Sequence, residues 1–181
     1  MKFYTGIGSR KVPYNIMNIM TIIATKLSER DYILRSGGAN GSDNAFEKEV
    51  INNNKDIYLP SSYFNGRKSN MINYYDVTQF NNYNIAYDIA LKNHPNFNVL
   101  SPFVKKLMTR NTYQILGKDL ETLSDFVICW TPDGCSHHNE RRLSTGGTGQ
   151  AISIASKHNI QIFNLCREDH KIKLFNFIKN L

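Results

Sequence analysis

The chain has 181 residues, 41% of them hydrophobic, and its 22 Lys and Arg against 15 Asp and Glu give a net charge of +7. This length predicts one compact domain covering residues 1–181 that needs no disulfide or structural metal, and the composition excludes collagen-like, disordered and small disulfide-rich proteins. No stretch reaches the roughly 18 apolar residues of a membrane span, so we expect a soluble protein without a membrane partner, and the positive charge favours anionic partners such as nucleotides or nucleic acid.

The first third of the chain alternates between short apolar runs and helical patterns. The apolar runs end at glycine, serine or proline, as strands do, and the intervening segments repeat apolar residues at three- and four-residue spacing. We expect strands and helices in this order: a strand at Lys2–Ile7, a helix from Pro13 to about Arg30, a strand at Tyr32–Leu34, a helix from Ser42 to about Val50 and a strand at Ile57–Leu59.

The remainder continues this alternation after a polar, glycine-interrupted stretch at residues 61–73, which we expect to lie on the surface. The expected elements are helices at 83–91 and 102–116, a strand at 126–130, a helix from residue 151, a strand at 160–165 and a helix at 172–178. Strands that alternate with helices predict a mostly parallel sheet with helices on both faces.

Three of the predicted strands lead into glycine-rich loops, which should lie at the same edge of the sheet. Glycine lets the backbone approach an anion, and the following helix directs free N–H groups toward it. A single loop of this kind is more often a simple turn, but together the three predict a site for a phosphate or pyrophosphate. The glycines are Gly6 and Gly8; Gly37, Gly38 and Gly41; and Gly146, Gly147 and Gly149.

Polar side chains in and near these loops could complete such a site. Arg10 and Arg110 could form charge-assisted bonds to phosphate oxygens, although Arg10 could equally form a structural ion pair. Hydroxyl groups provide further donors, namely those of Ser9, Ser36, Ser42, Thr145 and Thr148.

Asp43 and Glu47 lie four residues apart and therefore on one face of the second predicted helix. They are candidate catalytic residues: acid, base or nucleophile at a glycosidic bond, or partners of a ribose hydroxyl. An acidic residue in a first helical turn is also an ordinary partner of the helix dipole, which is the alternative for Asp43. Because Phe46 should point into the core, we expect Glu47 to face the mouth of the cleft.

The three cysteines, at residues 129, 135 and 166, are irregularly spaced and odd in number, so we expect a reducing cytoplasm. Cys135, His137 and His138 invite a zinc interpretation, but their spacing does not match that of structural zinc sites. We therefore expect neither a metal nor a cofactor.

Aromatic residues near the predicted strand ends could stack on a base, although single aromatics more often belong to the core. Residues 65–67 could form a flap over the site. The aromatic candidates are Trp130, Tyr63, Phe64 and Tyr113.

Four motifs together resemble those of the SLOG superfamily, which has a Rossmann-like fold. They are Gly8-Ser9-Arg10, Ser36 through Asp43, Arg110-Asn111, and Gly146 through Gly149. The chain most resembles compact, phage-encoded relatives of DNA-processing protein A. The resemblance implies a single Rossmann-like domain that forms homo-oligomers in the cytoplasm of the host cell. It also implies a ligand-binding set of Gly8, Ser9, Arg10, Ser36, Gly37, Gly38, Ser42, Asp43, Arg110, Asn111, Thr145, Gly146, Gly147 and Thr148.

The resemblance implies three alternative functions. Phosphoribohydrolases of the superfamily carry a catalytic glutamate in a PGGxGTxxE loop, where this chain has Gln150 and Ile152 or Ser153. We therefore expect a binding protein for a phosphorylated nucleotide, of the kind that sequesters a host immune signal. The alternatives are a single-stranded DNA-binding protein like DNA-processing protein A, and a nucleotide N-glycosidase that uses Asp43 or Glu47.

Overall fold

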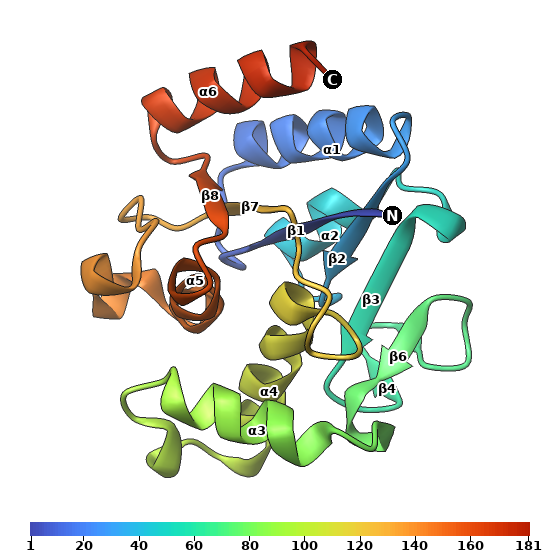
Figure 1. Ribbon diagram of the computed structural model, residues 1–181, viewed down its shortest axis with the longest axis vertical. Coiled ribbons are helices and arrows are strands. Elements are labelled where there is room, and N and C mark those ends of the chain that lie inside the picture. Colours follow the sequence, from blue (N-terminus) through green and yellow to red (C-terminus); the bar gives the residue numbers. More distant parts are fainter.

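The computed structural model describes all residues 1–181 and contains one six-stranded sheet in the order β6-β3-β2-β1-β7-β8 (Figure 1). Every neighbouring pair in this sheet is parallel. Its strands are β1 (Lys2–Gly8), β2 (Tyr32–Ser36), β3 (Lys55–Leu59), β6 (Tyr74–Asp76), β7 (Phe126–Trp130) and β8 (Gln161–Asn164). A separate antiparallel hairpin consists of β4 (Tyr63–Phe64) and β5 (Arg67–Lys68).

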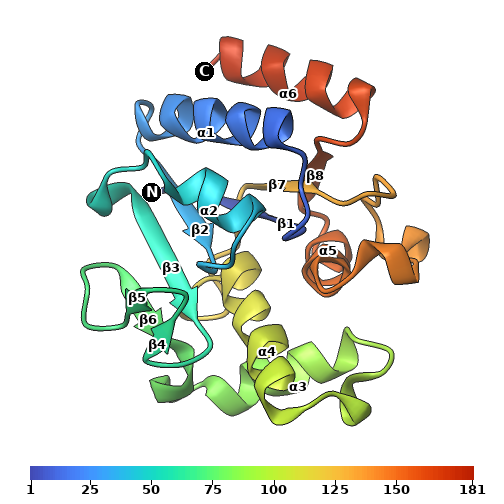
Figure 2. The ribbon, with the colours of Figure 1, turned by 180° about the vertical axis from the view of Figure 1, so that it is seen from behind.

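Helices cover both faces of the sheet, which confirms the predicted Rossmann-like α/β fold (Figures 1 and 2). Helices α1, α2 and α6 pack on one face, α4 and α5 on the other, and α3 packs against α4. The helices are α1 (Tyr14–Ser28), α2 (Ser42–Glu47), α3 (Tyr83–Lys92), α4 (Pro102–Leu116), α5 (Thr148–Lys157) and α6 (Glu168–Lys179). Short 3-10 turns occupy residues 52–54, 77–79, 97–99, 138–140 and 143–145.

The strand order reverses at β1. From β1 the chain builds the sheet outward through β2, β3 and β6, and then returns to add β7 on the other side, in register from Tyr4 opposite Phe126 to Gly8 opposite Trp130. Open parallel sheets bind ligands in the crevice beyond the carboxyl ends of the strands at such a reversal. The loops that leave β1 and β7 are therefore the first place to look for a site.

Helix α4 begins and ends at residues suited to those positions. The Ser101 hydroxyl accepts a hydrogen bond from the Val104 N–H at 3.4 Å, and Pro102 occupies the first turn, where its missing N–H costs nothing. Gly117 follows the last turn with a φ of +80°, which favours glycine. Every residue of α4 from Leu107 to Leu116 is buried, so this helix forms part of the core.

The structure differs from the sequence predictions mainly between β3 and α3. The stretch predicted as a surface excursion contains the β4–β5 hairpin, and the edge strand β6 was not predicted. β6 has only three residues and lacks a long apolar run, so its pairing with β3 leaves little trace in the sequence. None of the helices combines the length and apolar character of a membrane-spanning segment.

Candidate functional site

A cleft of about 440 Å³ opens at the carboxyl ends of β1 and β7. One wall is the loop after β1, residues 7–11, and another is the segment that leads into α5, residues 144–148. Ala39 and Asp43 of the β2–α2 region line it, as does the face of α4 that carries residues 104, 107, 108, 111 and 114. The structure thus brings the β1 loop and the α5 loop together, with α4 between them.

The two loops that line this cleft contain backbone N–H groups without an acceptor. The N–H groups of Arg10, Gly147 and Thr148 donate to no acceptor within the chain, and Thr148 is the first residue of α5. The positive end of the α5 dipole adds to the potential there. The exposed side chains of Arg10 and Lys11 line the same cleft. Unengaged amides, a helix N-terminus and two cations together form a wall that suits a phosphate group.

A buried ion pair forms the floor of the cleft. The Arg110 Nη1 lies 3.1 Å from Asp43 Oδ2, and the two side chains are 6% and 5% exposed. The Ala39 N–H also donates to this carboxylate, at 3.3 Å. Burial raises the pKa of Asp43, and the charge of Arg110 opposes that rise. Burial lowers the pKa of Arg110, the charge of Asp43 opposes that fall, and the charge of Arg10 lowers the pKa further, so Arg10 and Arg110 are close enough for their charges to interact.

Gln114 extends this pair into a network across the top of the sheet. With the Gln114 amide oxygen oriented toward Arg110, this oxygen accepts hydrogen bonds from Arg110 Nη1 at 2.9 Å and from the Gly37 N–H at 2.8 Å. The Gln114 amide nitrogen then donates to Asn111 Oδ1 at 3.0 Å. Asn111 in turn donates to the Gly147 carbonyl at 3.5 Å. The polar face of α4 therefore connects the β2 loop to the α5 loop.

The β2 loop supports its neighbours more than it lines the cleft. A Cβ at Gly37 would come within 1.2 Å of Arg110 Nη1, so only glycine allows the guanidinium to approach. The Ser36 hydroxyl donates to the Gly6 carbonyl at 2.7 Å, and the Ser42 hydroxyl donates to the Ser9 carbonyl at 3.0 Å. Of the predicted site residues, the structure places Ser36, Gly37, Gly38 and Ser42 outside the cleft lining.

The other predicted site residues line the cleft, namely Gly8, Ser9, Arg10, Asp43, Arg110, Asn111, Thr145, Gly146, Gly147 and Thr148. The Thr145 hydroxyl donates to Asp133, so this buried side chain holds its loop rather than offering a free donor. Two further polar residues of the cleft lining, Lys11 and Gln114, were not predicted. Their positions gave a signal, because Lys11 adjoins Arg10 and Gln114 lies one helical turn after Arg110.

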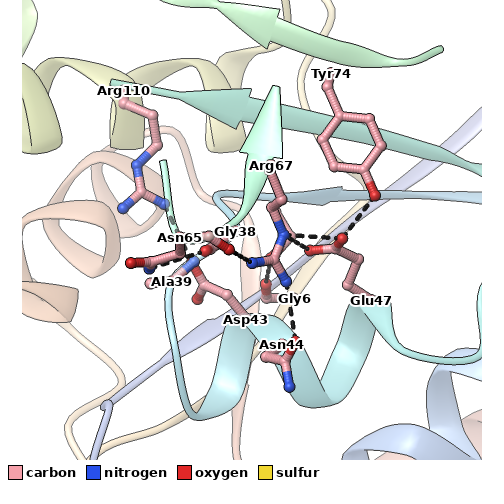
Figure 3. A network of polar contacts seen from close by, with 11 residues as sticks. Gly6, Gly38, Ala39, Asp43, Asn44, Glu47, Asn65, Arg67, Tyr74 and Arg110 are labelled. Carbon is pink, nitrogen blue, oxygen red and sulfur yellow. Dashed lines mark hydrogen bonds and ion pairs between the residues drawn. The ribbon is translucent and has the colours of Figure 1, made fainter. Parts of the chain in front are cut away.

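Glu47 does not face the cleft, so that prediction was wrong. Its carboxylate accepts from Arg67 Nε at 2.8 Å and from the Tyr74 hydroxyl at 2.7 Å (Figure 3). Arg67 also donates to Asn44 Oδ1 at 2.9 Å. The β4–β5 hairpin covers the second turn of α2. The Glu47 carboxylate therefore binds Arg67 and Tyr74 and is buried beneath the hairpin.

The segment predicted as a flap belongs to this hairpin. The Asn65 side chain donates to the Gly38 carbonyl at 3.2 Å (Figure 3). A Cβ on Gly38 would lie 2.7 Å from Arg67 Cδ, so only glycine allows the hairpin to approach this closely. The hairpin therefore packs on the β2–α2 loop and holds it in place from the side away from β1.

Other candidates from the sequence lie elsewhere. Tyr113 is buried and stacks on Tyr58 with ring centroids 5.9 Å apart, and neither Trp130 nor Tyr63 lines the cleft. Cys129 lies in the apolar core, where burial raises the pKa of its thiol. No three His, Cys, Asp or Glu side chains come together in a way that could hold a metal ion.

Comparison with known proteins supports the fold. No model of a protein family matches the chain, and no curated protein sequence matches it. Among solved structures it is similar to DNA processing protein A from Helicobacter pylori, whose structure was determined to describe its single-stranded DNA binding mode. The TM-score is 0.60 at 16% identity, over 99% of this chain and 79% of that one. At this identity the likeness shows that the two chains share a fold.

Proposed function

We propose that this protein binds single-stranded DNA through a phosphate of the strand, at the cleft between the β1 loop and the N-terminus of α5. The observation that carries the proposal is the wall of unengaged N–H groups on Arg10, Gly147 and Thr148 beside the exposed cations Arg10 and Lys11. The net charge of +7 and the shared fold with a single-stranded DNA-binding protein also support it.

The geometry favours contact with the DNA backbone over contact with base edges. Backbone amides and arginine side chains recognise phosphate oxygens, and such contacts fix the strand without reading its sequence. Arg10 and Lys11 are adjacent and exposed, so they can also contact a phosphate next to the one at the α5 N-terminus. The expected binding is therefore tolerant of sequence and sensitive to salt.

The test is a salt series of fluorescence anisotropy with a labelled oligothymidine. Each phosphate neutralised on a single strand contributes about −0.7 to the log–log slope, so Arg10→Ala/Lys11→Ala should make the slope less steep by about 1.4. Lys173→Ala/Lys179→Ala is the matched control, because it removes the same charge from exposed positions on α6. Equal slopes for the two variants would show that the cleft is not the DNA site.

A discrete phosphorylated nucleotide is the second candidate ligand, and the volume of the cleft favours it. About 440 Å³ lies within the range of small-molecule sites, and α4 gives the cleft an apolar wall. A sequestering protein would bind such a ligand without changing it. Isothermal titration with nucleotides and cyclic dinucleotides tests this function. If none of these ligands gives a heat of binding and oligothymidine binds tightly, the ligand is DNA.

Cleavage of a nucleotide N-glycosidic bond is the third candidate. Asp43 supplies the only carboxylate in the cleft lining, and burial raises its pKa in the direction that a general acid requires. Chromatography of nucleotides and NAD incubated with the protein would detect a released base. Under this function Asp43→Asn abolishes release, whereas Glu47→Gln retains it because Glu47 lies outside the cleft. Absence of release from every substrate removes the hypothesis.

A further inference from the structure

An exposed aromatic ring lies on α4, beside the residues of that helix that line the cleft. Phe103, in the first turn of α4, is 48% exposed, and its ring centroid lies 6.2 Å from that of Phe64 in the β4–β5 hairpin. Phe64 itself is buried. The hairpin therefore supports one side of the Phe103 ring, while about half of the Phe103 residue stays open to solvent.

Helical geometry makes Phe103 continuous with the cleft. Leu107 lies one turn further along α4, on the same face as Phe103, and Leu107 lines the cleft together with Val104 and Met108. These side chains form an apolar strip that starts at the exposed ring and runs down into the cavity. The same cleft is also lined by the exposed side chains of Arg10 and Lys11 and by the residues at the N-terminus of α5.

The two walls match the two parts of a nucleotide strand. Phosphates are charged and suit the wall of cations and amides, whereas the faces of the bases are apolar and aromatic. A strand with a phosphate at the α5 N-terminus carries its bases within reach of the rest of the cleft lining, and the apolar strip of α4 is the part of that lining that suits a base. An exposed ring with a rigid neighbour behind it provides a flat surface there.

We propose that Phe103, supported by Phe64, stacks on a base of the bound strand. This inference rests on the proposed function, because the phosphate at the α5 N-terminus fixes where the base lies. It adds a physical basis for strand selectivity: a single strand offers free base faces, whereas in a duplex both faces of each base are covered by stacking. It also explains tolerance of sequence, since every base has a face that can stack.

The test combines a protein variant with a DNA variant. Loss of one base-stacking contact weakens binding by about 5- to 150-fold. Phe103→Ala should therefore bind oligothymidine at least about fivefold more weakly than the unmodified protein. On an oligonucleotide with abasic sites in place of its bases, the two proteins should bind equally. The salt slope should stay the same, because Phe103 carries no charge.

Two further variants separate stacking from simple packing. Phe103→Leu keeps an apolar contact with Phe64 but lacks a ring, so it should lose most of the same affinity, while Phe103→Tyr should retain it. Phe175→Ala is the matched control, because Phe175 is 45% exposed and lies on α6, on the other face of the sheet. Thermal unfolding of each variant confirms that it is folded.

The outcomes are distinguishable. If the unmodified protein fails to bind oligothymidine, the proposed function is refuted and this inference with it. If the protein binds but Phe103→Ala and Phe175→Ala match it, base stacking at Phe103 is refuted while the phosphate site stands. If Phe103→Ala loses as much affinity for abasic DNA as for oligothymidine, or changes the oligomeric state, the ring acts through packing and the inference is wrong.

Discussion

Replacing Arg110 with methionine tests the buried ion pair directly. In the folded protein the Asp43 carboxylate accepts hydrogen bonds from Arg110 Nη1 at 3.1 Å and from the Ala39 N–H at 3.3 Å, and both charged side chains are almost fully buried. Methionine fills most of the volume of the arginine stem but leaves the carboxylate with one donor. The variant therefore contains a buried negative charge without its counter-ion.

The expected cost is large but compatible with folding. Breaking a buried pair by removing one partner destabilises a protein by about 3–5 kcal/mol. A domain of this size typically has about 5–15 kcal/mol of stability and loses about 2–4 °C of melting temperature per kcal/mol. We therefore expect Arg110→Met to lower the melting temperature by about 6–20 °C.

Urea unfolding followed by the fluorescence of Trp130, the only tryptophan, measures this cost. Arg30→Met is the matched control, because the half-buried Arg30 has no carboxylate partner and its guanidinium donates only to the Lys26 carbonyl. We expect that control to stay within about 0.5 kcal/mol of the unmodified protein. Adding Asp43→Asn to Arg110→Met should recover much of the loss, since it removes the unpaired charge.

The loss should depend on pH. Burial already raises the pKa of Asp43, and without Arg110 that pKa rises further above the unfolded value of about 3.9. Between the two values the folded variant binds a proton that the unfolded chain has released, so its stability is highest near the unfolded pKa and falls as the pH rises. A loss below about 1 kcal/mol at neutral pH, or one that does not shrink toward pH 4, would refute this account of the pair.

Three other predictions concern the core and the loops. Gly37→Ala should cost at least about 2 kcal/mol in urea unfolding, because its Cβ would overlap the Arg110 guanidinium, and a neutral result would contradict that packing. Tyr4→Phe should be neutral or stabilising, since the buried Tyr4 hydroxyl has no hydrogen-bond partner, and a loss above about 1 kcal/mol would show that it has one. A thiol reagent should label the exposed Cys166 first and Cys129 only on unfolding, because burial raises the pKa of Cys129; rapid labelling of all three cysteines in the folded state would oppose this.

The fold was predictable because its central strands have simple signatures. A strand buried on both faces reads as a continuous apolar run, as at Phe126–Trp130, and glycine or proline marks where such runs end. The edge strand Tyr74–Asp76 has neither mark. It exists because Ile57–Leu59 offers it a partner. Pairing of this kind is a property of the assembled sheet and leaves no local pattern.

The candidate site was predictable to the extent that topology determines it. Parallel strands place their carboxyl ends on one edge, so the glycine loops after β1 and before α5 could be expected to meet. The sequence could not reveal which glycines serve a neighbour. Gly37 is needed for Arg110, which lies 73 positions later, and the second turn of α2 is covered by Arg67 from the hairpin. Both contacts join segments whose proximity only the folded chain establishes.

The buried polar side chains of α4, Arg110, Asn111 and Gln114, should affect DNA binding more than they affect stability. A buried ion pair is seldom the most stable filling for its volume, so Asp43→Asn/Arg110→Met should cost far less stability than Arg110→Met alone. The double variant nevertheless lacks the guanidinium that holds Gln114, and through it Gly37 and Asn111. We therefore expect its affinity for oligothymidine to fall about tenfold while its urea midpoint stays near that of the unmodified protein. If the affinity falls only as far as the urea midpoint does, these side chains stabilise the fold and do not position the DNA site. Residues that position the site must weaken binding by more than their effect on stability.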